Sequence, residues 1–401
     1  MSLDDGAGRR NVRLLSSCFA LSTTGNVVLV SVSALVGYEL ADDKSLATLP
    51  AALMWIGTAL ATVPASFLMR RVGRRFGFMT GAVIGMCGAA LGALAVTLQN
   101  FEMFCFAIMV IGAYNGFNYY LRFAGAEVAS EDYRSRAIAL VMAGGVVAGF
   151  AGPALAKAAN ALFTPPAYLG PFVAIVFVAM AVGLVASFVK IPRPSAVQLR
   201  GGRPLSEITR QPVVVIAVLC SMIAYLVMIL LMTVTPLAMV QGVHSFSDAT
   251  FVIQWHVLGM FVPSFFSGHL IRRFGVLAVM AWGAIAIITG ISIALMGVEV
   301  FHFWLSMTLL GLGWNFLFIG STTLLTEAYT TAERAKTQAL NEFIVFGGAG
   351  IGSFLSGNLH FYLGWDVLNW AALPPVVTAL IAVLWLDRRR RAGYAGVNIA
   401  E

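Results

Sequence analysis

The chain has 401 residues, of which 59% are apolar and 11% are charged, and its mean hydropathy is +0.87. A soluble domain carries about 25% charged residues, so this composition excludes a soluble globule, and the same apolar excess excludes a disordered chain. The apolar runs are continuous and do not alternate with polar residues, which excludes a transmembrane β-barrel and predicts an all-α polytopic membrane protein.

Twelve stretches of the sequence are long and apolar enough to cross a bilayer, because a transmembrane helix needs about 20 such residues. The sequence therefore predicts twelve transmembrane helices. In chain order the predicted spans are 14–36, 48–69, 76–98, 101–124, 136–160, 168–189, 212–237, 249–271, 276–297, 301–325, 336–360 and 367–386.

The net charge of +7 is concentrated in the segments before the first span and after the even-numbered spans. Four arginines follow span 2, at Arg70, Arg71, Arg74 and Arg75, and four more, Arg388 to Arg391, follow span 12. Because positively charged loops stay in the cytoplasm, we predict a multi-pass protein of the cell inner membrane with both termini cytoplasmic. The basic excess then serves topology and contact with anionic lipid, and nucleic acid is not an expected partner.

The longest polar stretch inside the chain is KIPRPSAVQLRGGRPLSEITRQ, at residues 190–211, and its Pro, Gly and Arg content is typical of a linker. This stretch separates six predicted spans from the following six. We therefore predict an N-terminal six-helix bundle at residues 1–190, a cytoplasmic linker at 191–211 and a C-terminal six-helix bundle at 212–401.

The two halves of the chain also repeat each other in sequence. A shift of 200 residues places Asn115 on Asn315, Glu127 on Glu327, and Arg134 on Arg334. A shift of 202 residues places the RRVG that follows span 2 on the RRFG that follows span 8. Matches at two equivalent pairs of loops indicate a duplication, so we predict two pseudo-symmetric bundles with a substrate site near the midplane between them.

The loop after span 2, SFLMRRVGRRFG, resembles the G-x-x-x-D-R-x-G-R-R signature of the major facilitator superfamily. Four positions match, and Ser66 and Arg70 replace the leading Gly and the Asp. The loop after span 8, GHLIRRFG, keeps the Gly as Gly268 and has Arg272 at the Asp position. Together with twelve spans and the repeat, this resemblance implies a secondary active transporter that works by alternating access.

The resemblance also implies that these loops control the opening and closing of the transporter. A cationic turn at a helix C-terminus suits the helix dipole and can pair with nearby carboxylates. The alternative is that the arginines only set topology. The residues predicted to have this gating role are Arg71, Gly73, Arg74, Arg75, Glu127, Arg272, Arg273, Glu327 and Arg334.

Span 4 carries polar residues at helical spacing. Asn115, Asn118 and Arg122 follow an i, i+3, i+7 pattern and share one face, with Tyr119 beside them. Such a face must contact protein or water, because lipid cannot satisfy it. Arg122 lies about 7.5 Å deeper than Glu127, so its expected partner is a carboxylate on the substrate or Glu342. The alternative is an arginine that extends to the membrane interface.

Spans 1, 7 and 10 carry matching polar or aromatic residues, and in the superfamily these helices line the cavity together with span 4. Serines and threonines on them have an alternative role, in bonding to their own helix carbonyls. The residues predicted to bind substrate are Asn26, Asn115, Asn118, Tyr119, Arg122, Tyr225, Trp314 and Asn315.

Glu342 is an acidic residue well inside span 11, on one face with Gln338 and Asn341. A buried carboxyl can take up a proton, so Glu342 is the predicted site of coupling to a proton gradient. The alternative is an ion pair with Arg334 or Arg122.

No phosphate-binding loop, metal-ligand cluster or nucleophile with a base is present in the sequence. The four cysteines lie in predicted spans without metal-ligand spacing. We therefore expect no cofactor, no metal and no enzymatic activity, and we regard a membrane sensor or enzyme as the least favoured class. A monomer is the default in the superfamily.

The stretch YYLRFAGAEVASEDYRSRAIAL, at residues 119–140, resembles a bacterial branch of the superfamily that includes riboflavin importers. The resemblance implies uptake of riboflavin, whose flat ring system could stack on aromatic side chains. The alternative is proton-coupled efflux of drugs or metabolites. Gly152 and Pro153 match part of the antiporter motif G-x-x-x-G-P-x-x-G-G, but Ala156 and Lys157 replace its final glycines.

Overall fold

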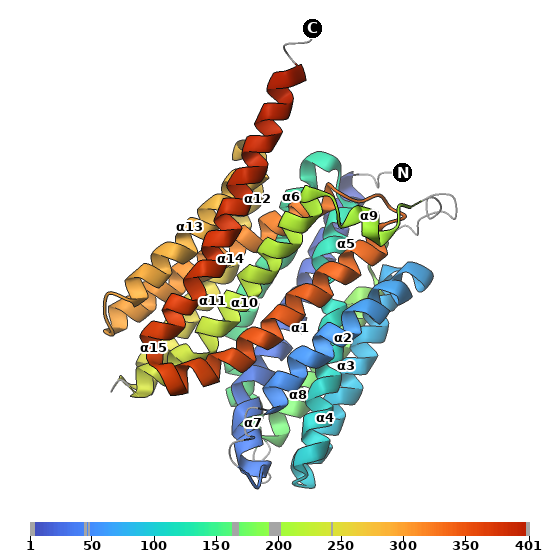
Figure 1. Cartoon of the computed structure of the whole chain (residues 1–401). Coiled ribbons are helices and arrows are strands. Elements are labelled where there is room, and N and C mark those ends of the chain that lie inside the picture. Colours follow the sequence, from blue (N-terminus) through green and yellow to red (C-terminus); the bar gives the residue numbers. More distant parts are fainter. Residues whose placement is uncertain are drawn as a thin grey trace. The chain divides into compact units, whose positions relative to one another are not determined.

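A computed structural model describes residues 5–43, 46, 49–162, 168–191, 202–241 and 244–397 of the chain. Within these ranges every regular element is a helix, and Figure 1 follows these helices in chain order. Among the described residues, eleven helices are long and apolar enough to cross a membrane, and a bent helix pair makes twelve if it is counted as one span. The predicted all-α membrane fold is confirmed, and the predicted spans coincide with these helices to within a few residues at most ends.

The first six spans are built from α1 to α8. Span 4, Phe101–Val128, is interrupted by a turn between α4 and α5, and span 5 combines η2, α6 and α7. The helix α1 packs against α7 and α8, and α2 packs against α4. The elements are α1 (Asp5–Leu40), α2 (Leu49–Val72), α3 (Arg74–Thr97), α4 (Phe101–Asn118), α5 (Leu121–Val128), η2 (Glu131–Tyr133), α6 (Arg134–Ala143), α7 (Gly145–Leu162) and α8 (Leu169–Ser187).

The remaining spans are built from α10 to α15, after the short helix α9. The helices α11 and α12 form one span that bends by 41° next to Pro263, which cannot donate a backbone hydrogen bond. The long element α15 contains two spans and reverses direction around Gly364, whose φ is +84° (Figure 1). The elements are α9 (Leu205–Ile208), α10 (Pro212–Gln241), α11 (Phe246–Phe261), α12 (Ser264–Phe274), α13 (Val276–Ala294), α14 (Val300–Thr326) and α15 (Arg334–Val397).

The helices group into two compact units. The first unit is Met1–Arg200 with Arg334–Gly350, and the second is Gly201–Glu333 with Ile351–Glu401. The first part of α15, Arg334–Gly350, thus groups with the helices of the first unit. Residues 192–201 of the predicted linker lie outside the described residues. The predicted bundle boundaries at residues 190 and 212 stay a prediction.

The duplication that the sequence indicates is also visible in the turns after spans 2 and 8. Gly73 joins α2 to α3 with φ at +91°, and Gly275 joins α12 to α13 with φ at +88°. Residues with a side chain rarely adopt this left-handed region, so glycine is required at both turns. The G of the repeated RRxG segment is therefore explained by backbone geometry.

Glycines also repeat where spans 2 and 4, and spans 8 and 10, cross closely. A Cβ atom at Gly57 or Gly112 would collide with backbone atoms of the facing helix. The same holds for Gly259 and Gly311 in the second unit. Small residues that let two backbones approach are typical of helix packing in membranes.

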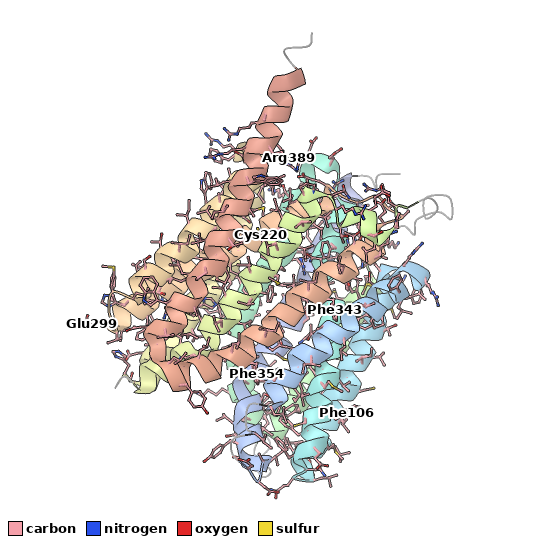
Figure 2. All side chains as sticks on the ribbon, viewed as in Figure 1. Phe106, Cys220, Glu299, Phe343, Phe354 and Arg389 are labelled. Carbon is pink, nitrogen blue, oxygen red and sulfur yellow. The ribbon has the colours of Figure 1, made fainter. Side chains whose placement is uncertain are left out.

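Large apolar side chains cover the outside of the helices, as expected for surfaces in lipid (Figure 2). Phe106 on α4 is 54% exposed and Phe354 on α15 is 69% exposed. Cys220, by contrast, is fully buried. The apolar excess in the sequence is thus distributed between helix packing and an exposed apolar surface.

Candidate functional site

An ion pair inside the first unit joins span 4 to span 11. Arg122 on α5 donates from Nη2 to Glu342 Oε1 on α15 at 2.6 Å, and both side chains are buried. Asn341 Nδ2 donates to the same oxygen at 2.6 Å, and Arg122 Nη1 donates to the Tyr119 carbonyl at 2.8 Å. The alternative role considered for Glu342, a pair with Arg122, is therefore what the structure contains.

The burial of this pair has an energetic consequence. Removing one partner of a buried pair leaves an uncompensated charge, which costs about 3–5 kcal/mol. The second carboxylate oxygen, Glu342 Oε2, has no hydrogen-bond partner among the described residues. Ionisable residues inside membrane spans are costly and usually serve function. The arrangement is compatible with proton coupling at Glu342, which stays a prediction.

Three asparagines that were predicted to bind substrate lie in the first unit, two on α4 and one on α1. Asn115 Nδ2 donates to Asn26 Oδ1 at 3.1 Å, which links α4 to α1. The Asn118 amide lies near the Tyr114 hydroxyl, but neither group has a partner with hydrogen-bond geometry among the described residues. Buried polar groups are normally paired with protein or water. The Asn118 amide therefore has unused hydrogen-bonding capacity for a polar ligand.

An aromatic stack lies beside the ion pair. Tyr119, in the turn between α4 and α5, contacts Phe346 on α15 with ring centroids 4.1 Å apart. Trp55 on α2 lies on Phe346 with centroids 6.1 Å apart and ring planes 15° apart. Three spans of the first unit therefore contribute rings to one place.

The predicted binding residues of the second unit form a separate cluster around α14. Tyr225, Trp314 and Phe318 pack with ring centroids about 5 Å apart. Trp314 is 1% exposed, and Asn315 is fully buried. The Asn315 amide donates at 2.6 Å both to the Met260 carbonyl and to an adjacent serine hydroxyl, Ser264 Oγ, at the bend of span 8. In this structure Asn315 therefore supports helix packing inside its unit, and its role in binding stays a prediction.

The loop after span 2 places one of its arginines in a charged cluster of the first unit. Arg74 forms an ion pair with Glu127, and Arg334 Nη1 lies 3.1 Å from Glu127 Oε2. Arg74 Nη2 also donates to Gln338 Oε1 on α15. The predicted pairing of this loop with Glu127 is thus made by Arg74, whereas Arg71 is exposed.

The remaining predicted gating residues are placed differently. Arg75 is exposed at the start of α3, and Arg272 and Arg273 are exposed at the end of α12. Glu327 is 41% exposed and pairs with Arg390 at 3.1 Å. Their roles in gating stay predictions.

Comparison with known proteins agrees with this architecture. The sequence model of the Major Facilitator Superfamily matches residues 14–254 and 217–398. The riboflavin transporter RfnT of Brucella anthropi is 38% identical over 385 residues, which cover 95% of this chain and 96% of that protein. The chain belongs to the Major Facilitator Superfamily. The predicted membership is confirmed, and the chain is a multi-pass membrane transporter of a small molecule.

Other superfamily members show how widely the fold is shared. The uncharacterised transporter YdeG of Bacillus subtilis is 26% identical over 393 residues and covers 92% of this chain and 91% of its own. FucP, solved in the outward conformation, has a TM-score of 0.75 at 16% identity and covers 96% of this chain and 99% of its own. The human organic anion transporter MFSD10 has a TM-score of 0.75 at 13% identity, with coverages of 94% and 99%.

Some residues of this superfamily member were not anticipated as functional. Glu333 accepts hydrogen bonds from the Arg203 guanidinium and from the Arg203 backbone N–H, at 2.7 and 2.9 Å. It also accepts from the Thr330 backbone N–H at 2.9 Å. The hydrogen bonds from Arg203 hold the pKa of Glu333 well below its usual value. The T-x-x-E pattern at 330–333 is a helix-start signal that could have indicated this acceptor.

Two further residues of span 11 could have been found by helical spacing. Gln338, Glu342 and Phe346 recur every four residues, so they share one face of α15. Gln338 contacts the charged cluster and Phe346 contacts the aromatic stack. The face that carries Glu342 therefore links three features of the first unit.

Proposed function

We propose that this transporter takes up riboflavin across the cell inner membrane by proton symport. The observation that carries the proposal is the 38% identity to RfnT, the riboflavin transporter of Brucella anthropi, over nearly the full length of both chains. The superfamily supplies alternating access as the mechanism of transport.

The chemistry of the first unit suits such a substrate. The isoalloxazine ring of riboflavin is flat and apolar on its faces, so it would stack on Tyr119 or Trp55. Its edge carries an imide, whose N–H and carbonyl groups complement the unpartnered amide of Asn118. Asn26 and Asn115 provide further amide groups. In the second unit, Tyr225, Trp314 and Asn315 stay the predicted binding residues.

Coupling to protons would use the Arg122–Glu342 pair. A proton that binds to the Glu342 carboxylate removes its charge, which weakens the bond to Arg122 and frees the guanidinium for another partner. Return of the proton restores the pair. The groups that face Glu342 in this step are Arg122, Asn341 and Tyr120. The burial of both partners supports this assignment, because ionisable residues inside membrane spans are costly and usually serve function.

Gating would use the charged cluster of Glu127 with Arg74 and Arg334. Its bonds connect the loop after span 2, the end of span 4 and the start of span 11. Breaking these bonds would allow the start of span 11 to move during the transport cycle. The exposed charges of the repeat would assist this movement, namely Arg71, Arg75, Arg272, Arg273 and Glu327.

The orientation and assembly of the chain are also part of the proposal. The arginine-rich loops support a cytoplasmic position of both termini, and the protein would act as a monomer without enzymatic activity. Glu127, Arg334 and Glu333 would then lie at the cytoplasmic side.

Uptake of labelled riboflavin into proteoliposomes tests the proposal. An inward proton gradient is expected to drive accumulation above equilibrium, and a protonophore is expected to abolish it. Expression should also rescue a riboflavin auxotroph. The partial antiporter motif at Gly152 and Pro153 defines the competing outcome, in which the protein exports solutes, does not rescue the auxotroph and raises resistance to drugs.

A further inference from the structure

The aromatic stack of Trp55, Tyr119 and Phe346 is arranged unevenly. Phe346 is fully buried, whereas Trp55 and Tyr119 are only half-buried. The Tyr119–Phe346 contact, at 4.1 Å with planes 32° apart, is closer than the Trp55–Phe346 contact at 6.1 Å. Phe346 therefore covers a face of Tyr119 that a flat ligand would otherwise use.

The stack and the ion pair connect the same two helices. Tyr119 and Arg122 are three residues apart at the α4–α5 junction, and Glu342 and Phe346 are four residues apart on α15. Residues at these spacings lie on one helix face, one turn apart. Arg122 Nη1 also donates to the Tyr119 carbonyl at 2.8 Å, which ties the ion pair to the ring. A movement of this segment of α15 that takes Phe346 away from Tyr119 would therefore also carry Glu342 away from Arg122.

Local packing leaves room for such a movement. A Cβ atom at Gly347 would meet no atom of the described chain within 4 Å, and one at Gly350 would meet only Trp55 at 3.8 Å. The glycines at the crossing of spans 2 and 4 would instead collide with backbone. Open space therefore lies beside α15 at Gly347 and Gly350, one and four residues after Phe346.

We propose that the Phe346 ring occupies the position of the substrate ring in the unliganded transporter and is displaced when a flat aromatic substrate stacks on Tyr119. Displacement of Phe346 separates Glu342 from Arg122, so substrate binding and release of the carboxylate become one event. This inference rests on the proposed function and specifies how substrate and proton are coupled.

Binding of riboflavin to purified protein in nanodiscs tests the ring exchange, because two substitutions are expected to have opposite effects. Tyr119→Leu removes the surface on which the substrate stacks and is expected to weaken binding by about tenfold. Phe346→Leu removes the competing ring and is expected to tighten binding several-fold. A residue that only stabilises the fold would not improve binding when it is lost.

Matched variants control for folding. Phe343→Leu changes an exposed ring on the same helix, which is 44% exposed, and is expected to bind like the unaltered protein (Figure 2). Tyr119→Phe keeps the ring and is expected to retain binding. If the unaltered protein binds no riboflavin, the proposed function and this inference both fail. If it binds, but Phe346→Leu and Tyr119→Leu both weaken binding or both leave it unchanged, only the ring exchange is overturned.

A second measurement follows the carboxylate. Riboflavin is expected to increase labelling of Glu342 by a hydrophobic carbodiimide several-fold, because the separated carboxylate becomes accessible. In Phe346→Leu the same addition is expected to have little effect on labelling, and Glu342→Gln provides the background. Unchanged labelling in the unaltered protein would overturn the link between ring displacement and the ion pair.

Discussion

The loops that follow spans 4 and 10 have the same sequence pattern but hold their charges differently. Glu127 is 8% exposed and lies between Arg74 and Arg334. Its repeat partner Glu327 is 41% exposed and has an ion pair with Arg390 at 3.1 Å. In the second loop the buried carboxylate is instead Glu333, which is 2% exposed.

The difference shows that the burial and ion pairs of a repeated residue depend on the segments that pack against it. Arg334 and Gln338, at the start of α15, enclose the first loop. The second half of the predicted linker encloses the second loop, where Arg203 Nη2 and Gln211 Nε2 both donate to the Ala328 carbonyl. The two loops therefore share a pattern of charges but differ in the segments that enclose them.

The difference between the two halves of the chain is largest inside the membrane spans. The largest effect of a substitution is therefore expected there. The repeat position of Arg122 is Thr322, and that of Glu342 is Met142, so this pair has no counterpart. Arg122→Ala is expected to abolish uptake and to destabilise the protein by about 3–5 kcal/mol, because it leaves a buried carboxylate unpaired. Thermal unfolding and proteoliposome flux measure the two effects.

A double substitution separates stability from transport at the same pair. Arg122→Leu with Glu342→Leu is expected to recover most of the stability, because apolar residues can replace a buried pair at little cost. Its uptake is expected to stay absent. Proton-driven uptake by the double variant would show that the pair is structural and that coupling occurs elsewhere.

The two loop carboxylates give the next prediction. Glu127→Ala is expected to destabilise the protein by about 3 kcal/mol and to reduce uptake at least several-fold, since Arg74 is itself only 7% exposed and would be left without its carboxylate. Glu127→Gln, which keeps an acceptor, should cost less. Equal effects of Glu127→Ala and Glu327→Ala on unfolding would mean that the two loops are equivalent and that the burial difference has no consequence.

Most of the fold could be predicted because its determinants are local. Continuous apolar runs define the spans, and the RRxG turns require glycine at Gly73 and Gly275, which have positive φ. The break in span 4 at Tyr119 and Tyr120 was not predicted, because no Pro or Gly marks it. The continuation of α15 to Val397 was not predicted either, since its last residues are polar and a hydropathy criterion ends the span earlier.

The site was predicted less completely, because it depends on contacts between distant segments. Helical spacing identified Arg122 and Glu342, and their opposite charges made a pair one of two alternatives. Nothing local indicates that Arg203 reaches Glu333, which is 130 residues away in sequence. The ring of Phe346 was missed because phenylalanine is common throughout the spans, so only its partner Tyr119, beside polar neighbours, was distinctive.

The bond between Arg203 and Glu333 is expected to make a smaller contribution that depends on pH. Because the pKa of Glu333 is lowered in the folded protein, its contribution is present above the usual value of 4.5 and is lost as the pH falls towards the lowered value. Arg203→Ala is expected to cost about 1 kcal/mol, since Arg203 is 35% exposed. Its thermal midpoint should approach that of the unaltered protein in acid, and a difference that grows in acid would contradict the assignment.

Glu327 gives the smallest expected effect and the sharpest test of the comparison. Its pair with Arg390 joins two side chains that are each at least one third exposed, and such surface pairs contribute about 0–1 kcal/mol. Glu327→Gln is expected to leave both uptake and the thermal midpoint nearly unchanged, and added salt should change neither further. A large loss of uptake with unchanged stability would show that Glu327 acts at another stage of the transport cycle, and that the repeat retained a function that burial in this structure does not indicate.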